Sequence, residues 1–256
     1  MWRFRIRLCR FAGVDVSLHP SWFLVLALFV WASTRAFADV YPGLPLTERA
    51  AMGVLSGVAF FSCLAVHELA HAVVARRFGI RVLGITLFMF GGMARISGEP
   101  ASPSEECAVA LAGPATSGVV GGVFALASLG ATRAGWTGAE GVLATLALVN
   151  VGVALFNLVP GLPLDGGRLL RAGLWRMTGD HARSTRVAAG VGRALAGIMI
   201  AAGLVVVFRR EAVGLWYVML GGFLWFLARA SAVTRALSPE GALALHDEDQ
   251  APQPRS

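Results

Sequence analysis

Long apolar runs separated by short polar segments dominate the pattern along the chain. A helix needs about 20 mostly apolar residues to cross the core of a bilayer, and six runs approach or exceed that length. Their ends carry Pro, Gly or Arg, which are typical of helix boundaries and loops at a membrane surface. The sequence therefore predicts an all-α polytopic membrane protein with about six transmembrane helices, near residues 22–37, 50–78, 106–129, 141–159, 187–208 and 213–227.

Two segments follow a different pattern. Residues 80–97 are rich in β-branched and aromatic types and are broken by Gly84 and Gly91-Gly92, which predicts short strands with a bend. Irregular or extended backbone at membrane depth must be covered by protein or water, so we expect a small re-entrant or membrane-associated β element after the second helix. It could offer an edge to an unwound substrate, or simply seal the loop. Residues 1–20 alternate Arg with apolar residues, which favours a strand or an interfacial segment.

Three ionisable residues, His67, Glu68 and His71, lie inside the second apolar run in an H-E-x-x-H pattern. On a helix, residues four apart share one face, so both imidazoles could bind a single zinc ion. Glu68 lies one step round the helix, where a general base for hydrolysis belongs. Charged groups in hydrocarbon are costly and usually functional. The alternative is a pair of core histidines bonded to their neighbours.

A second polar motif follows the fourth run. Two prolines and three glycines lie between Phe156 and Arg168 and should end the helix, which leaves Asp165 on irregular backbone. A carboxylate placed in this way can be turned towards a metal. A solvated aspartate in an ordinary cytosolic turn would explain the same residues.

Composition and charge limit the class of protein. The chain has 256 residues, of which 56% are hydrophobic and 14% charged, and this argues against a soluble globule. Its 22 basic residues are all Arg and flank the apolar runs, so we expect a lipid bilayer as the partner and no nucleic acid. The Arg residues lie mainly in the segments that would face the cytosol if the N-terminus were there, which predicts a multi-pass protein of the cell membrane with both termini in the cytosol. Arg76-Arg77 ends the second run, which places the motif nearer the cytosolic side.

The organisation that follows has three parts: a basic cytosolic segment at 1–20, a six-helix domain at 21–237 and a disordered cytosolic tail at 238–256. The first apolar run also resembles a cleavable signal peptide, but the 20 residues before it are long for such a leader, and we favour a retained helix.

The motifs together resemble those of the site-2 protease family of intramembrane zinc metalloproteases. The resemblance lies in His67-Glu68-Leu69-Ala70-His71, Gly91-Gly92, Ala112-Gly113-Pro114 and the segment from Asn157 to Asp165-Gly166-Gly167-Arg168, in family order. No segment is long enough for a PDZ domain or for paired nucleotide-sensing domains, so the chain is most similar to the compact bacterial and archaeal members.

The resemblance implies specific roles. His67, His71 and Asp165 would bind one zinc ion, and Glu68 would handle the proton of the attacking water. Asn157 would steady the substrate carbonyl, and Gly91 and Gly92 belong to the part that docks unwound substrate. The implied activity is endopeptidase cleavage within or near the transmembrane segment of a single-span membrane protein, controlled by pre-cleavage of the substrate, by access through the helices or by a regulatory membrane partner.

Two other classes remain to be compared with a hydrolase: a membrane zinc transporter or metallochaperone, and an inactive membrane scaffold. A transporter should carry ionisable residues on several helices along a path, whereas here they gather at one depth. A scaffold should have lost Glu68 or a ligand, and all four residues are present. The pattern favours a protease.

Overall fold

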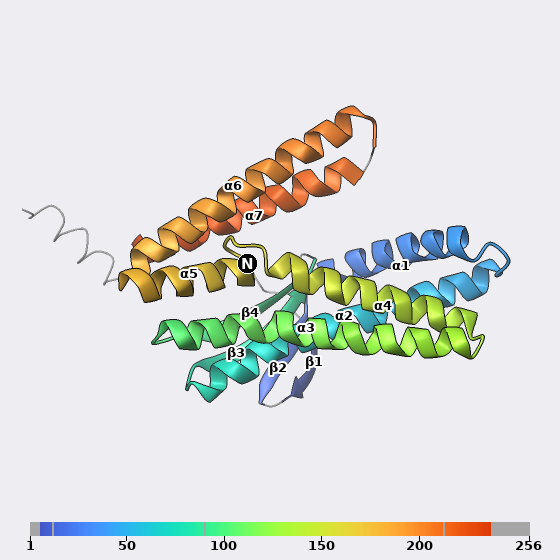
Figure 1. Cartoon of the computed structure of the whole chain (residues 1–256), viewed down its shortest axis with the longest axis horizontal. Coiled ribbons are helices and arrows are strands. Elements are labelled where there is room, and N and C mark those ends of the chain that lie inside the picture. Colours follow the sequence, from blue (N-terminus) through green and yellow to red (C-terminus); the bar gives the residue numbers. More distant parts are fainter. Residues whose placement is uncertain (1–5, 12, 90, 212, 237–256) are drawn as a thin grey trace, which may run out of the picture. The chain divides into compact units, whose positions relative to one another are not determined.

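The computed structural model describes residues 6–11, 13–89, 91–211 and 213–236. These residues form four strands and seven helices (Figure 1). The strands are β1 (Ile6–Phe11), β2 (Val14–Leu18), β3 (Arg81–Phe88) and β4 (Gly91–Ser97). The helices are α1 (Ser21–Val40), α2 (Leu46–Arg77), α3 (Pro103–Arg133), α4 (Thr137–Asn157), α5 (Asp165–Thr178), α6 (His181–Phe208) and α7 (Val213–Ala236). The expected tail at 238–256 lies outside the described residues.

Six of these helices, all except α5, are long and apolar enough to cross a membrane. This confirms the prediction of a polytopic, mainly helical membrane protein. Several helices are longer than their apolar runs because polar residues cap them. The start of α3 shows how: Ser102 Oγ accepts a hydrogen bond from the Glu105 amide at 3.3 Å, while Glu105 Oε2 accepts one from the Ala101 amide at 2.9 Å.

The strands form one sheet in the order β1-β2-β3-β4. Pairing is antiparallel within β1–β2 and β3–β4, and parallel between β2 and β3, where Val16 lies opposite Ile85. Strands were predicted in 80–97, and the N-terminal segment was expected to be a strand or an interfacial segment. The parallel pairing shows that both segments belong to the same sheet, with β4 at one edge.

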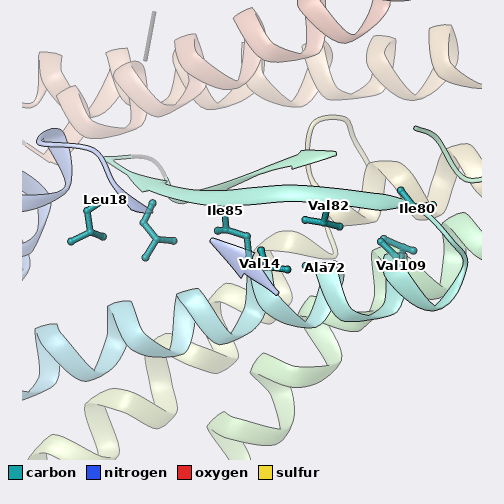
Figure 2. Packing of buried hydrophobic residues seen from close by; sticks show 9 residues of the cluster. Val14, Leu18, Ala72, Ile80, Val82, Ile85 and Val109 are labelled. Carbon is teal, nitrogen blue, oxygen red and sulfur yellow. The ribbon is translucent and has the colours of Figure 1, made fainter. Parts of the chain in front are cut away.

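The sheet packs against the C-terminal half of α2. Buried side chains from β2 and β3, among them Val14 and Ile85, meet Ala72 and Ala75 of α2 and Val109 of α3 (Figure 2). This apolar layer holds the last turns of α2 between the sheet and α3. One face of α2 is therefore committed to the sheet, and the face that carries His67 and His71 is turned to α3.

The chain divides into two compact units after Asn157. The first contains the sheet and α1 to α4, and the second contains α5 to α7. In the second unit α6 and α7 approach closely, because Gly203 and Gly214 each lie against the backbone carbonyl of the other. Small residues of this kind let helices pack tightly in lipid, where van der Waals contact supplies much of the attraction.

The segment after α4 differs from the prediction in one respect. Asp165 was expected on irregular backbone, but it is the first residue of α5, preceded by the extended residue Leu164. The helix α5 ends at Thr178, Gly179 takes a left-handed conformation with φ of 71°, and α6 begins at His181.

Candidate metal centre

His67 and His71 are both buried on successive turns of α2, and their rings meet edge to face with centroids 4.9 Å apart. The two Nε2 atoms lie 3.2 Å apart. Two nitrogen ligands of a tetrahedral zinc ion, each about 2.0–2.1 Å from the metal, would be separated by roughly 3.3 Å. The pair therefore fits two positions of a zinc site without any movement of α2.

The other nitrogen of each ring is bonded to α3. Nδ1 of His71 lies 2.7 Å from the carbonyl oxygen of Val109, and Nδ1 of His67 lies 2.9 Å from Oγ of Ser117. Histidines that bind metals usually donate their remaining N–H to such an acceptor, which fixes the ring and the tautomer. Both rings are thus held through Nδ1 by α3, while their Nε2 atoms approach each other.

Gly113 explains why α3 can come so close. It lies between Val109 and Ser117 on the same face of α3, and a Cβ atom at this position would overlap Nε2 of both histidines. The helix continues unbroken through the next residue, Pro114. The Ala-Gly-Pro motif therefore leaves room at the point where the rings converge.

Glu68 is half-buried and lies beside the start of β4. A Cβ atom on Gly92 would overlap the Glu68 side chain, so the backbone of β4 touches the candidate base directly. Gly91 has a different reason to be glycine, because its φ of 130° is rarely adopted by other residues. Both residues were predicted to bind substrate, and that role remains a prediction.

Asp165 belongs to the second unit, where it is buried at the first turn of α5. The positive end of the helix dipole favours a carboxylate there, and Nη1 of Arg168 lies 3.9 Å from Oδ1. Cβ atoms on Gly166 and Gly167 would overlap the backbone of residues 158–162. The Asp-Gly-Gly sequence thus lets α5 start directly against the loop that precedes it.

Asn157 is the last residue of α4, and its Nδ2 donates a hydrogen bond to the carbonyl oxygen of Val153 at 3.0 Å. The amide is therefore engaged within its own helix. The amide nitrogen has two N–H donors, so this bond does not exclude a second one to a substrate oxygen, and the role stays a prediction.

Sequence reasoning did not identify Ser117 or the carbonyl of Val109. Helical spacing could have indicated Ser117, because residues four apart on a helix share a face and Ser117 lies four residues after Gly113. No sequence pattern could indicate Val109, since every residue of a helix has a carbonyl and only packing selects one.

The fold and the histidine pair define the class as a polytopic membrane protein with a candidate metal site between α2 and α3. Comparison with known families makes this specific. The family model described as Peptidase family M50 matches residues 56–132 and 119–202, so the chain belongs to this family.

The chain is also similar to individual members. Rip3 of Mycobacterium tuberculosis is 40% identical over 228 residues, which cover 88% of this chain and 58% of Rip3. Zinc metalloprotease MJ0392 of Methanocaldococcus jannaschii is 31% identical over 203 residues, covering 78% of this chain and 54% of MJ0392. The chain thus spans somewhat more than half the length of these relatives.

A solved structure shows the same architecture. The site-2 protease from Methanocaldococcus jannaschii aligns with a TM-score of 0.59 and 26% identity, over 90% of this chain and 95% of that one. The resemblance noted from the motifs is confirmed at the level of family and fold.

Proposed function

We propose that this protein is a zinc-dependent intramembrane endopeptidase that cleaves a peptide bond within or near the transmembrane segment of a single-span membrane protein. The observation that carries the proposal is the histidine pair: two buried Nε2 atoms 3.2 Å apart, with both Nδ1 atoms bonded to α3 and a glutamate at the next position. Membership of Peptidase family M50 supports the same activity.

His67 and His71 would supply two ligands of one zinc ion, and Asp165 of the second unit would supply the third. A carboxylate with two imidazoles is a ligand set that zinc commonly takes in hydrolases. A zinc ion held there would polarise the scissile carbonyl and activate water for attack. The local structure of Asp165 supports this role, since the residue is buried at the first turn of α5 and Gly166 and Gly167 pack against the backbone of residues 158–162.

Glu68 would accept the proton of the attacking water and return it to the leaving amine. Its contact with Gly92 places β4 beside it, and β4 is an edge strand of the described sheet. A substrate helix hides its own carbonyl groups in hydrogen bonds, so it must unwind before attack. An unwound segment that paired with β4 would then pass next to Glu68, which is the arrangement that strand addition provides.

The site would open towards the cytosol. Arg76 and Arg77 end α2, and Arg residues mark cytosolic boundaries. At 1.5 Å per residue, His71 and His67 would lie on the order of 8–14 Å inside that boundary. Water must therefore reach a site below the membrane surface.

The test uses the purified protein in liposomes with a tagged single-span substrate whose span contains a Gly-Pro pair, because helix breakers should favour cleavage. We expect Glu68→Gln to retain one zinc ion per chain and to abolish cleavage. Glu48→Gln is the matched control: it makes the same change on the exposed first turn of α2 and should cleave normally. Undiminished cleavage by Glu68→Gln would remove Glu68 from the mechanism.

Asp165→Ala should lose zinc and cleavage together. Asp180→Ala is its control, because Asp180 caps α6 by accepting a hydrogen bond from the Arg183 amide and should affect stability but not zinc. Unchanged zinc content in Asp165→Ala would refute the ligand assignment. Zinc flux into the liposomes without proteolysis by the wild-type protein would favour a transporter instead.

A further inference from the structure

The two histidines differ in the partner that holds Nδ1. The Val109 carbonyl 2.7 Å from His71 can only accept, so Nδ1 of His71 must carry the proton. In the neutral ring Nε2 is then unprotonated and directed at His67. The tautomer of His71 is fixed by the backbone of α3 and cannot change without moving the helix.

Ser117 gives His67 more freedom, because a hydroxyl can both donate and accept. If Ser117 Oγ accepts from Nδ1, then Nε2 of His67 is unprotonated as well, and two lone pairs face each other across 3.2 Å. That arrangement suits a cation between them. If Ser117 donates to Nδ1, then Nε2 carries the proton and can donate to His71 across the same distance. That arrangement needs no cation.

We propose that Ser117 is a positioning residue whose hydroxyl reverses direction when the metal binds, so that His67 changes tautomer while both rings stay in place. The Nε2 proton of His67 passes to water that enters with the metal ion, and Nδ1 takes up a proton from that water as the hydroxyl turns, so the charge of the ring does not change. The inference rests on the proposed zinc site and adds to it a residue outside the ligand set.

The packing around Ser117 supports this role. Its exposed fraction is 2%, so bulk water cannot replace the hydroxyl, and it follows Gly113 by one helical turn on the face that touches both rings. Without the hydroxyl, Nδ1 of His67 would lose its hydrogen bond to α3. The tautomer with the proton on Nε2, where it blocks the metal, would then no longer be opposed by an acceptor at Ser117.

The experiment compares Ser117→Ala, Ser117→Thr and Ser128→Ala in detergent. Ser128 is the matched control: it is a buried serine of α3, and its Oγ donates to the Glu140 carbonyl at 3.3 Å, away from the histidines. Zinc dissociation constants are measured by chelator competition. Removal of such an outer partner typically weakens metal binding by roughly 10–100-fold. We expect that loss of affinity for Ser117→Ala. Ser117→Thr should bind zinc almost normally, and Ser128→Ala should keep the wild-type affinity.

A second readout does not depend on zinc affinity. Nitrogen NMR of ¹⁵N-histidine-labelled protein reports the tautomer of each ring at fixed pH. In the wild type we expect His67 to be protonated at Nε2 without metal and at Nδ1 with zinc, and His71 to be protonated at Nδ1 in both states. This measurement stays decisive even if Ser117→Ala does not fold.

Three results would overturn the inference. One is equal zinc affinity in the wild type and Ser117→Ala, which would leave the proposed function intact. Another is a His67 tautomer that does not change on zinc binding. The third is a wild-type protein that binds no zinc, which would overturn the proposed function as well.

Discussion

The predicted ligands of the two units are held in place by different physical means. His67 and His71 are held by hydrogen bonds from a second helix, α3, whose partner atoms lie 50 and 38 residues away in the chain. Asp165 is held by close backbone packing over a few residues, because Gly166 and Gly167 lie directly against the loop before α5. The histidine site therefore depends on long-range helix packing, and the aspartate on a local turn.

The difference predicts how each half can be broken. Hydrogen bonds tolerate conservative changes that keep the bonding atom, whereas a backbone contact tolerates no added atom at all. At the histidine pair and at Asp165 alike, a glycine in close contact should tolerate substitution least. The helix that carries that glycine also has a glycine in open space, which serves as a control.

The largest effect is expected for Gly113→Ala. The added methyl group would occupy the space where Nε2 of both histidines converge, so the rings must rotate away and zinc affinity should fall by more than about 100-fold. Chelator competition measures the loss. Gly118→Ala lies on the same helix, where an added Cβ would meet no atom of the described chain within 4 Å, and it should bind zinc normally. Wild-type affinity in Gly113→Ala would contradict the packing described for α3.

Gly166→Ala should act mainly on stability. Its methyl group would overlap the carbonyl groups of Leu158 and Val159, and such overpacking costs about 1–3 kcal/mol. We expect a lower unfolding temperature in detergent and weaker zinc binding as Asp165 shifts. Gly173→Ala, in open space within α5, should instead stabilise by about 0.5–1 kcal/mol because it restricts the unfolded chain. Equal melting temperatures for the two variants would show that the turn is not tightly packed.

The smallest effect is expected at the opposite end of α2 from the histidines, where Tyr41 donates a hydrogen bond to Oε2 of Glu140 at 2.8 Å. Burial, followed by the hydrogen bond and the negative charge of Glu140, raises the pKa of Tyr41 from 10.0 to about 12. The folded state holds this proton more tightly than the unfolded state. Its stabilising contribution is complete below pH 10 and is lost as the pH rises to about 12.

Tyr41→Phe should therefore flatten the pH dependence of the unfolding temperature between pH 10 and 12 and leave zinc binding unchanged. At neutral pH the loss of one hydrogen bond should cost about 1 kcal/mol. An identical alkaline slope in Tyr41→Phe and the wild type would show that another group controls it. Altered zinc affinity in Tyr41→Phe would mean that the contact near the start of α2 is coupled to the histidines near its end.

Much of the fold could be predicted because its determinants are local. Apolar runs of sufficient length indicate membrane helices wherever they occur, and the composition of 80–97 indicated strands. The start of α5 at Asp165 was not predicted, because two prolines and three glycines suggest irregular backbone. Only the packing of Gly166 and Gly167 against the preceding loop shows that a helix can begin there.

By itself the sequence determined the helical character of the chain, its membrane class and the pairing of His67 with His71, since helical periodicity sets the spacing of residues four apart. The tertiary structure alone decided that Ser117 and the Val109 carbonyl hold the two rings, and that Gly92 brings β4 against Glu68. These contacts join segments distant in the chain. Each depends on how closely two backbones approach, and that distance is set by the packing of the whole unit.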